Sequence, residues 1–148
     1  MNRVEIDIKL LTKTAKIPTR GSSEAAGYDL YADIEKDIEI RPHTTEKIGT
    51  GIALAIPNGY FGGIFARSGL ATKQGLRPAN ATGVVDADYR SQIIVALYND
   101  SDEPQTITPG MRIAQLIVIP FLPLDFTQVD KLDDTQRGSG GFGSTGTK

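Results

Sequence analysis

The stretch Ile52-Ala53-Leu54-Ala55-Ile56 is apolar throughout, stops at Pro57-Asn58-Gly59 and resumes as Tyr60-Phe61-Gly62-Gly63-Ile64-Phe65. Pro-Asn-Gly is typical of a turn, so this stretch predicts one strand on each side of a turn. A short strand closed by proline or glycine is the unit that recurs along the rest of the chain.

Four further runs indicate strands. Residues 4–10 and 34–40 alternate apolar with charged side chains, whereas residues 92–98 and 113–121 are strongly apolar. Alternation is typical of a strand with one buried face, and the apolar run at 92–98 predicts a strand covered on both faces. One short helix is expected after Ser68, over Gly69 to Gln74, with Ser68 as its N-cap. Many short strands of this kind predict an all-β sandwich, jelly roll or barrel.

Length and composition predict one domain followed by an arm. The chain has 148 residues, enough for one domain with a core of its own. Apolar content falls after about Asp134, where glycine takes over. We therefore expect a single domain over residues 1–134 and a flexible glycine-rich C-terminal arm over residues 135–148.

Charge and rare residue types narrow the classes of function. The formal net charge of −2 does not favour a broadly basic surface for nucleic acid. Without cysteine, the chain has no disulfide, thiolate metal site or cysteine nucleophile. His43, the one histidine, is expected in a surface loop. No secretory signal or membrane-spanning run is visible, so a cytoplasmic location and no membrane partner are expected.

Two segments interrupt the strand pattern with polar residues. Asp29 follows Gly27-Tyr28, and its carboxylate could hold Mg²⁺ through water or cap a turn at a strand edge. Arg67-Ser68-Gly69 lies at the start of the expected helix. There, a guanidinium and free N–H groups could bind phosphate, or Ser68 could simply cap a helix beside a surface arginine.

Two later segments carry candidate catalytic side chains. Strand alternation over residues 83–90 places Asp86 and Asp88 on one face, where they could serve acid–base or metal chemistry or be solvated in a hairpin. Alternation also places Gln115 on the same side as Ile113. A buried glutamine must find hydrogen bonds, either to a catalytic group or to nearby backbone.

The glycine-rich tail carries Arg137, Phe142 and the hydroxyl pair Ser144-Thr145. Arginine and freed backbone N–H groups bind phosphate, and an aromatic ring stacks on a base. The tail is therefore either a frayed end or an arm that becomes ordered over a nucleotide.

Together, these segments resemble a known family. The five are Ala-Gly-Tyr-Asp-Leu (26–30), Arg-Ser-Gly-Leu-Ala (67–71), Gly-Val-Val-Asp-Ala-Asp-Tyr-Arg (83–90), Arg-Ile-Ala-Gln-Leu (112–116) and Arg-Gly-Ser-Gly-Gly-Phe-Gly-Ser-Thr-Gly (137–146). In this order they closely resemble the five motifs of the trimeric dUTP diphosphatases (dUTPases). The resemblance implies a homotrimer of jelly-roll subunits, distorted barrels of the β-clip type, with active sites built by all three chains. It also implies Mg²⁺-dependent hydrolysis of dUTP to dUMP and diphosphate, which limits uracil in DNA and supplies dUMP for thymidylate synthesis.

The resemblance also implies individual roles. Asp86 would activate the attacking water, Gln115 would lie near that water and the phosphates, and Asp29 would contact Mg²⁺ indirectly, through water. Tyr89 would lie against the deoxyribose, and Phe142 would cover uracil. The implied substrate-binding residues are Arg67, Ser68, Gly69, Asn80, Gly83, Val84, Val85, Asp86, Tyr89, Ile94, Gln115, Arg137, Phe142, Gly143, Ser144 and Thr145.

Two alternatives remain at this point. A dCTP deaminase shares the implied fold, but its motifs differ from the Ala-Asp-Tyr-Arg of residues 87–90. A non-catalytic jelly roll that senses a nucleotide or binds a partner would have no need for Asp86 as a base.

Overall fold

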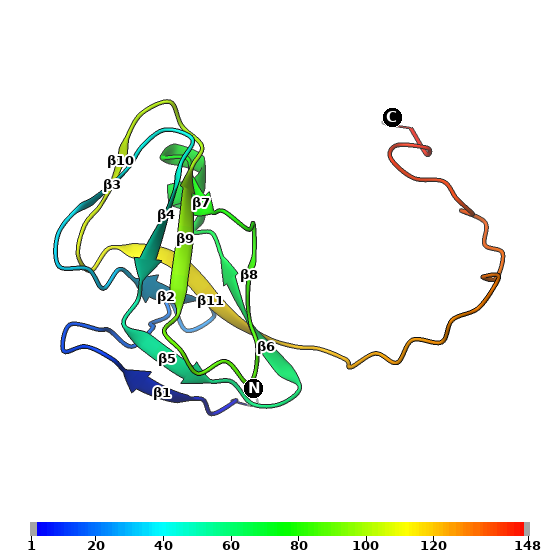
Figure 1. The fold of residues 1–148 in the computed structure, drawn as a ribbon, viewed down its shortest axis with the longest axis horizontal. Helices are drawn as coiled ribbons and strands as arrows, with labels where there is room; N and C mark the ends of the chain where they lie inside the picture. Colours follow the sequence, from blue (N-terminus) through cyan, green and yellow to red (C-terminus); the bar gives the residue numbers. More distant parts are fainter. Residues whose placement is uncertain (1–2, 147–148) are drawn as a thin grey trace.

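The computed structural model describes residues 3–146. Its strands are β1 (Asp7–Leu10), β2 (Tyr28–Tyr31), β3 (Ile38–Ile40), β4 (Thr45–Gly49), β5 (Ile52–Ala55), β6 (Tyr60–Phe65), β7 (Leu76–Pro78), β8 (Gly83–Val85), β9 (Ile94–Asn99), β10 (Gln105–Ile107) and β11 (Arg112–Pro120). One helix, α1 (Ser68–Lys73), lies between β6 and β7 (Figure 1). The predicted all-β fold with one short helix is confirmed.

The strands form four antiparallel sheets. The orders are β2-β11-β6-β8, β4-β9-β7, β1-β5 and β10-β3, and among the described residues they do not close into a barrel. Fully buried Leu30, Ile40, Ile52 and Leu97 come from the four different sheets and belong to one hydrophobic cluster. Burial of such side chains is the main force that holds the small sheets together.

The predicted turn at Pro57-Asn58-Gly59 is present. Tyr60 N–H donates to the Pro57 carbonyl at 3.2 Å, and Gly59 has a φ of +84°, which glycine adopts without strain. However, β5 pairs with β1, whereas β6 pairs with β11 and β8. The turn is therefore a corner between sheets and not a hairpin.

Two strands are less buried than their sequences predict. Val4 lies outside β1, and both Val4 and Leu10 are exposed. In β9, Val95 and Leu97 are buried, but Ile94 is 45% exposed. Successive side chains of a strand point to opposite faces, so Val95 and Leu97 lie on a buried face and Ile94 lies on the other face. The expectation that both faces are covered is therefore wrong within one chain.

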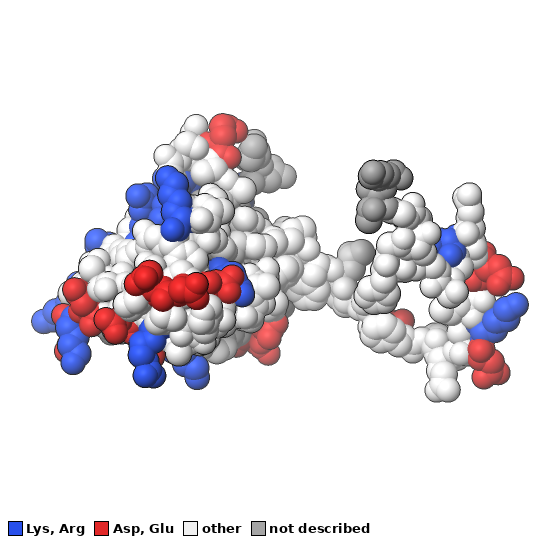
Figure 2. Space-filling view, turned by 90° about the horizontal axis from the view of Figure 1, so that it is seen from above, with Lys and Arg blue, Asp and Glu red and all other residues white. Residues whose placement is uncertain are grey.

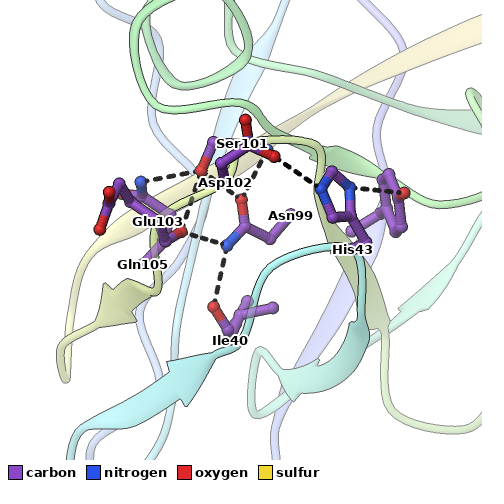
Figure 3. Close-up of polar contacts among 8 residues, drawn as sticks. Ile40, His43, Asn99, Ser101, Asp102, Glu103 and Gln105 are labelled. Atoms are coloured by element: carbon purple, nitrogen blue, oxygen red, sulfur yellow. Dashed lines mark hydrogen bonds and ion pairs between the residues drawn. The ribbon is translucent and has the colours of Figure 1, made fainter.

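Asn99, the last residue of β9, links this strand to the neighbouring segments through its side chain (Figure 3). Its side chain is fully buried and donates to the carbonyls of Ile40 at 2.9 Å and Glu103 at 2.7 Å. Its Oδ1 accepts from Ser101 N at 3.0 Å and Oγ at 2.7 Å. The side chain of His43 lies in a surface loop, as predicted, with Nε2 2.9 Å from Asp102 Oδ1.

The chain after Pro120 leaves the body of the protein as an extended arm (Figure 1). Residues 121–146 contain no helix or strand, and the apolar side chains of Leu122, Leu124 and Phe126 are exposed. Regular structure thus ends before the composition change near Asp134, and the domain boundary there stays a prediction.

In residues 3–146, no helix is long and apolar enough to cross a membrane. The cytoplasmic location also stays a prediction.

Candidate active site

A pocket of about 270 Å³ lies where β6, β8 and the start of β9 meet. Its lining residues are Ile64, Asn80, Gly83, Val84, Val85, Asp86, Tyr89, Ile93 and Ile94. All of them except Ile64 and Ile93 are among the substrate-binding residues predicted from the sequence. Ile64 lies opposite Gly83 across the β6–β8 pair, a pairing that the sequence alone does not specify.

The pocket depends on a glycine and a strand edge. A Cβ at Gly83 would lie only 3.2 Å from Ile64 Cβ and 3.5 Å from Asn80 Nδ2, so a larger side chain would fill this space. Among the described residues, β8 pairs with β6 and has no strand on its other side. Alternate N–H and C=O groups of an edge strand point away from its partner, where a ligand can pair with them.

Asp86 and Tyr89 lie at the pocket on a turn. β8 ends at Val85, and Tyr89 N–H donates to the Asp86 carbonyl at 3.1 Å. The expectation that Asp86 and Asp88 share a strand face is therefore wrong: Asp86 lines the pocket and Asp88 does not. The Tyr89 hydroxyl donates to the Gln92 carbonyl at 2.9 Å, which fixes its ring beside the pocket.

A second group of predicted residues is organised around Asp29 on β2. Asp29 Oδ1 accepts from Arg67 Nε at 2.9 Å, and Oδ2 accepts from Arg112 Nη1 at 3.2 Å. The Asp29 side chain is only 13% exposed, so both arginines satisfy a largely buried carboxylate. Arg112 is not among the site residues predicted from the sequence. Its partner lies 83 residues away, and only the β2–β11 pairing brings the two together.

Gln115 lies next to this cluster. Its Nε2 donates to the Ala66 carbonyl at 2.8 Å, and it faces Asp29 across β2–β11. The register of β11 shifts between Arg112 and Ala114, so Ile113 and Ala114 are both buried while Gln115 is only partly buried. Simple alternation with Ile113 is therefore wrong at this point, because a bulge adds one residue to the strand.

The start of α1 is open. Arg67, not Ser68, occupies the N-cap position, and no side chain caps the helix. The predicted capping role of Ser68 is therefore wrong; Ser68 is the first helical residue. Ser68 and Gly69 are exposed, and a Cβ at Gly69 would meet nothing within 4 Å. This leaves free space directly beside Arg67.

The acidic side chains near the site are better suited to a metal ion that is held mainly by substrate phosphates than to one held only by protein side chains. In residues 3–146, no three His, Asp or Glu side chains are grouped to hold a metal ion, and both oxygens of Asp29 are paired with arginines. Mg²⁺ usually keeps several waters and is held by one or two carboxylates together with substrate phosphates. The water-mediated contact of Asp29 stays a prediction.

The arm residues form a third group, away from the other two. Arg137 Nε donates to the Gly140 carbonyl at 2.8 Å, and Phe142 is fully exposed. The other predicted arm residues are Gly143, Ser144 and Thr145, which lie in turns at the end of the arm. In this single chain, the predicted residues thus form a pocket, an Asp29 cluster and an arm that have no residue in common.

Positive charge near the site is local. On the face seen in Figure 2, basic and acidic side chains are interspersed, without one broad basic field. Two guanidinium groups on one carboxylate at Asp29 leave an excess of one positive charge, which is suited to an anion.

Known proteins similar to this chain identify its family. The family model described as dUTPase matches residues 13–146. The deoxyuridine 5'-triphosphate nucleotidohydrolase of Desulfitobacterium hafniense is 44% identical over 149 residues, covering 99% of each chain. A mutant dUTPase of Staphylococcus bacteriophage 80alpha with dUpNHpp has a TM-score of 0.88 at 29% identity, covering 97% of this chain and 99% of that chain.

A third protein bears on the metal. A mutant dUTPase from phage phi11 of S. aureus, described in terms of the coordination of a structural Mg(II) ion, has a TM-score of 0.76 at 25% identity. It covers 86% of this chain and 98% of that chain. The four small sheets are thus those of a jelly-roll-type dUTPase fold, and the chain belongs to the dUTPase family.

Proposed function

We propose that this protein is a dUTP diphosphatase, which hydrolyses dUTP to dUMP and diphosphate. The observation that carries the proposal is the pocket at β8. It combines the unpaired edge of β8, the space left by Gly83 and the side chains of Asp86 and Tyr89. Together with family membership, it supplies a place for a base, a sugar and an attacking water.

The pocket is suited to uracil. Free backbone groups of β8 and the amide of Asn80 can pair with the donors and acceptors on the edge of the base. A base with a different pattern would leave buried polar groups unpaired, and such mismatches strongly disfavour binding. Buried Ile64 and Ile93 also line the pocket, and a 5-methyl group on the base would be excluded by lack of space beside such side chains. Tyr89 then lies against the deoxyribose.

Hydrolysis requires a water held in line with the bond that breaks. The exposed carboxylate of Asp86 would orient this water and take its proton. Arg67, with Ser68 and Gly69 beside it, would bind the phosphates, and Gln115 would lie near them. Magnesium bound to the triphosphate would offset its charge, with Asp29 contacting the hydrated ion.

We further propose that the active site is shared within a homotrimer. Support comes from the separation of the pocket, the Asp29 cluster and the arm in one chain. Exposed Ile94 and the exposed apolar residues Leu122, Leu124 and Phe126 of the arm offer surface that a neighbouring copy would cover. The arm would close over bound nucleotide, with Phe142 on uracil and Arg137, Gly143, Ser144 and Thr145 on the phosphates.

The test is diphosphate release from each deoxynucleoside triphosphate, and from UTP, in the presence of Mg²⁺. We expect release from dUTP alone at low enzyme concentration. Equal release from all nucleotides, or none from dUTP, would overturn the proposal. Ammonia release from dCTP would indicate a deaminase instead.

A further inference from the structure

Arg112 takes part in the Asp29 cluster, yet the proposed mechanism gives it no role. Its Nη1 lies 3.2 Å from Asp29 Oδ2, while Arg67 Nε takes Oδ1 at 2.9 Å. The Arg112 side chain is 50% exposed and that of Asp29 only 13%. Arg112 is thus an accessible cation that holds one end of a largely buried carboxylate.

Arg112 also restrains Arg67 through its backbone. Arg67 Nη1 donates to the Arg112 carbonyl at 3.4 Å, and its Nε is held by Asp29. The planar guanidinium is therefore fixed along two directions, and Nη2 makes no hydrogen bond within residues 3–146. A guanidinium fixed in this way presents its free donors to a ligand in one orientation.

The charge balance depends on Arg112 as well. Arg67 and Asp29 alone form a neutral pair, whereas the addition of Arg112 leaves one net positive charge. We propose that Arg112 is a positioning residue of the phosphate subsite, acting through Asp29 to orient Arg67 and to keep it available to the phosphates. This inference rests on the proposed function, because it assigns Arg67 to the phosphates of dUTP.

The first test compares Arg112→Gln with Lys16→Gln. Lys16 is a matched control because it is a nearby cation without a bond to Asp29. Its Nζ lies over the ring of Tyr31, and Tyr31 is opposite Arg112 in the β2–β11 pair. We expect Arg112→Gln to raise KM for dUTP and lower kcat/KM by about 10- to 100-fold, the usual effect of losing a charge-assisted hydrogen bond. Lys16→Gln should change kcat/KM by less than about threefold. Equal losses of kcat/KM in both variants would mean that the loss comes only from removing a positive charge, and this would overturn the inference.

The second test is a double-mutant cycle with Asp29→Asn. If Arg112 acts through Asp29, Arg112→Gln should add little to the loss already caused by Asp29→Asn, because coupled residues are not additive. Fully additive losses would overturn the inference. Arg112→Lys, which keeps the charge but not the forked geometry, should fall between wild type and Arg112→Gln.

Calorimetric titration with inorganic diphosphate separates this inference from the proposed function. We expect Arg112→Gln to weaken diphosphate binding by about 10-fold or more, at a temperature where circular dichroism shows that the variant is still folded. If the wild type binds diphosphate in this Arg112-dependent way but does not hydrolyse dUTP, the proposed function fails and the inference stands. Diphosphate binding that is unchanged in Arg112→Gln would overturn the inference itself.

Discussion

Gly27→Ala should slow catalysis strongly while leaving the fold almost intact. A Cβ at position 27 would lie 2.0 Å from Gln115 Oε1 and 2.9 Å from Gln115 Cδ. Non-bonded carbons attract best at about 3.5–4.0 Å, so the Gln115 amide has to rotate away. It then loses its 2.8 Å bond to the Ala66 carbonyl, a loss of about 0.5–1.5 kcal/mol in the free energy of unfolding.

The effect on turnover should be larger than the effect on stability. A catalytic group displaced by about 1 Å can cost about 10²-fold in rate, so we expect kcat for dUTP to fall by about 10- to 100-fold. Gly27→Ala, Gln115→Ala and the double variant should share nearly the same kcat in a diphosphate-release assay. Gly21→Ala is the matched control, because a Cβ there meets nothing within 4 Å. Wild-type kcat in Gly27→Ala, or a double variant far slower than either single one, would refute the reasoning.

Three further changes test other parts of the account. Asp86→Asn should still bind dUpNHpp in calorimetry but lose about 10²- to 10⁴-fold in kcat, the usual share of a general base; unchanged kcat would remove Asp86 from this role. Deletion of the residues from Gly138 onward should cripple turnover yet leave the trimer intact in sedimentation analysis, and a monomer would make the tail structural. Asn99→Ala should lower the free energy of unfolding by about 2–4 kcal/mol in urea titration, because the Ile40 carbonyl and Ser101 N–H lose their buried partner. The same variant should retain wild-type kcat below its unfolding transition, since Asn99 lies at the opposite end of β9 from Ile94, and a selective loss of kcat would contradict this separation.

Most residues of the pocket could be predicted because the resemblance to the dUTPase motifs implies them, and all of them except Ile64 lie between Asn80 and Ile94. Asn80, Gly83–Val85, Asp86 and Tyr89 fall within one short segment, and the turn that carries them also places them at one pocket. Ile64 could not be found in this way, because it reaches the pocket only through the β6–β8 register.

Irregular geometry accounts for the remaining differences. The shift in β11 between Arg112 and Ala114 breaks the alternation on which the side of Gln115 was predicted, and single-sequence patterns do not locate such bulges. Ser68 has the composition of an N-cap, but the helix begins one residue earlier than a capping Ser68 would require. Helix boundaries are commonly uncertain by one or two residues.

Hydrolysis of dUTP in ¹⁸O-labelled water, followed by mass spectrometry of both products, tests the central claim most directly. If Asp86 activates a water that attacks the α-phosphorus of a dUTP held at the β8 pocket, the label should enter dUMP, and the diphosphate should stay unlabelled. Label in the diphosphate, release of orthophosphate, or no dUMP at all would contradict the account.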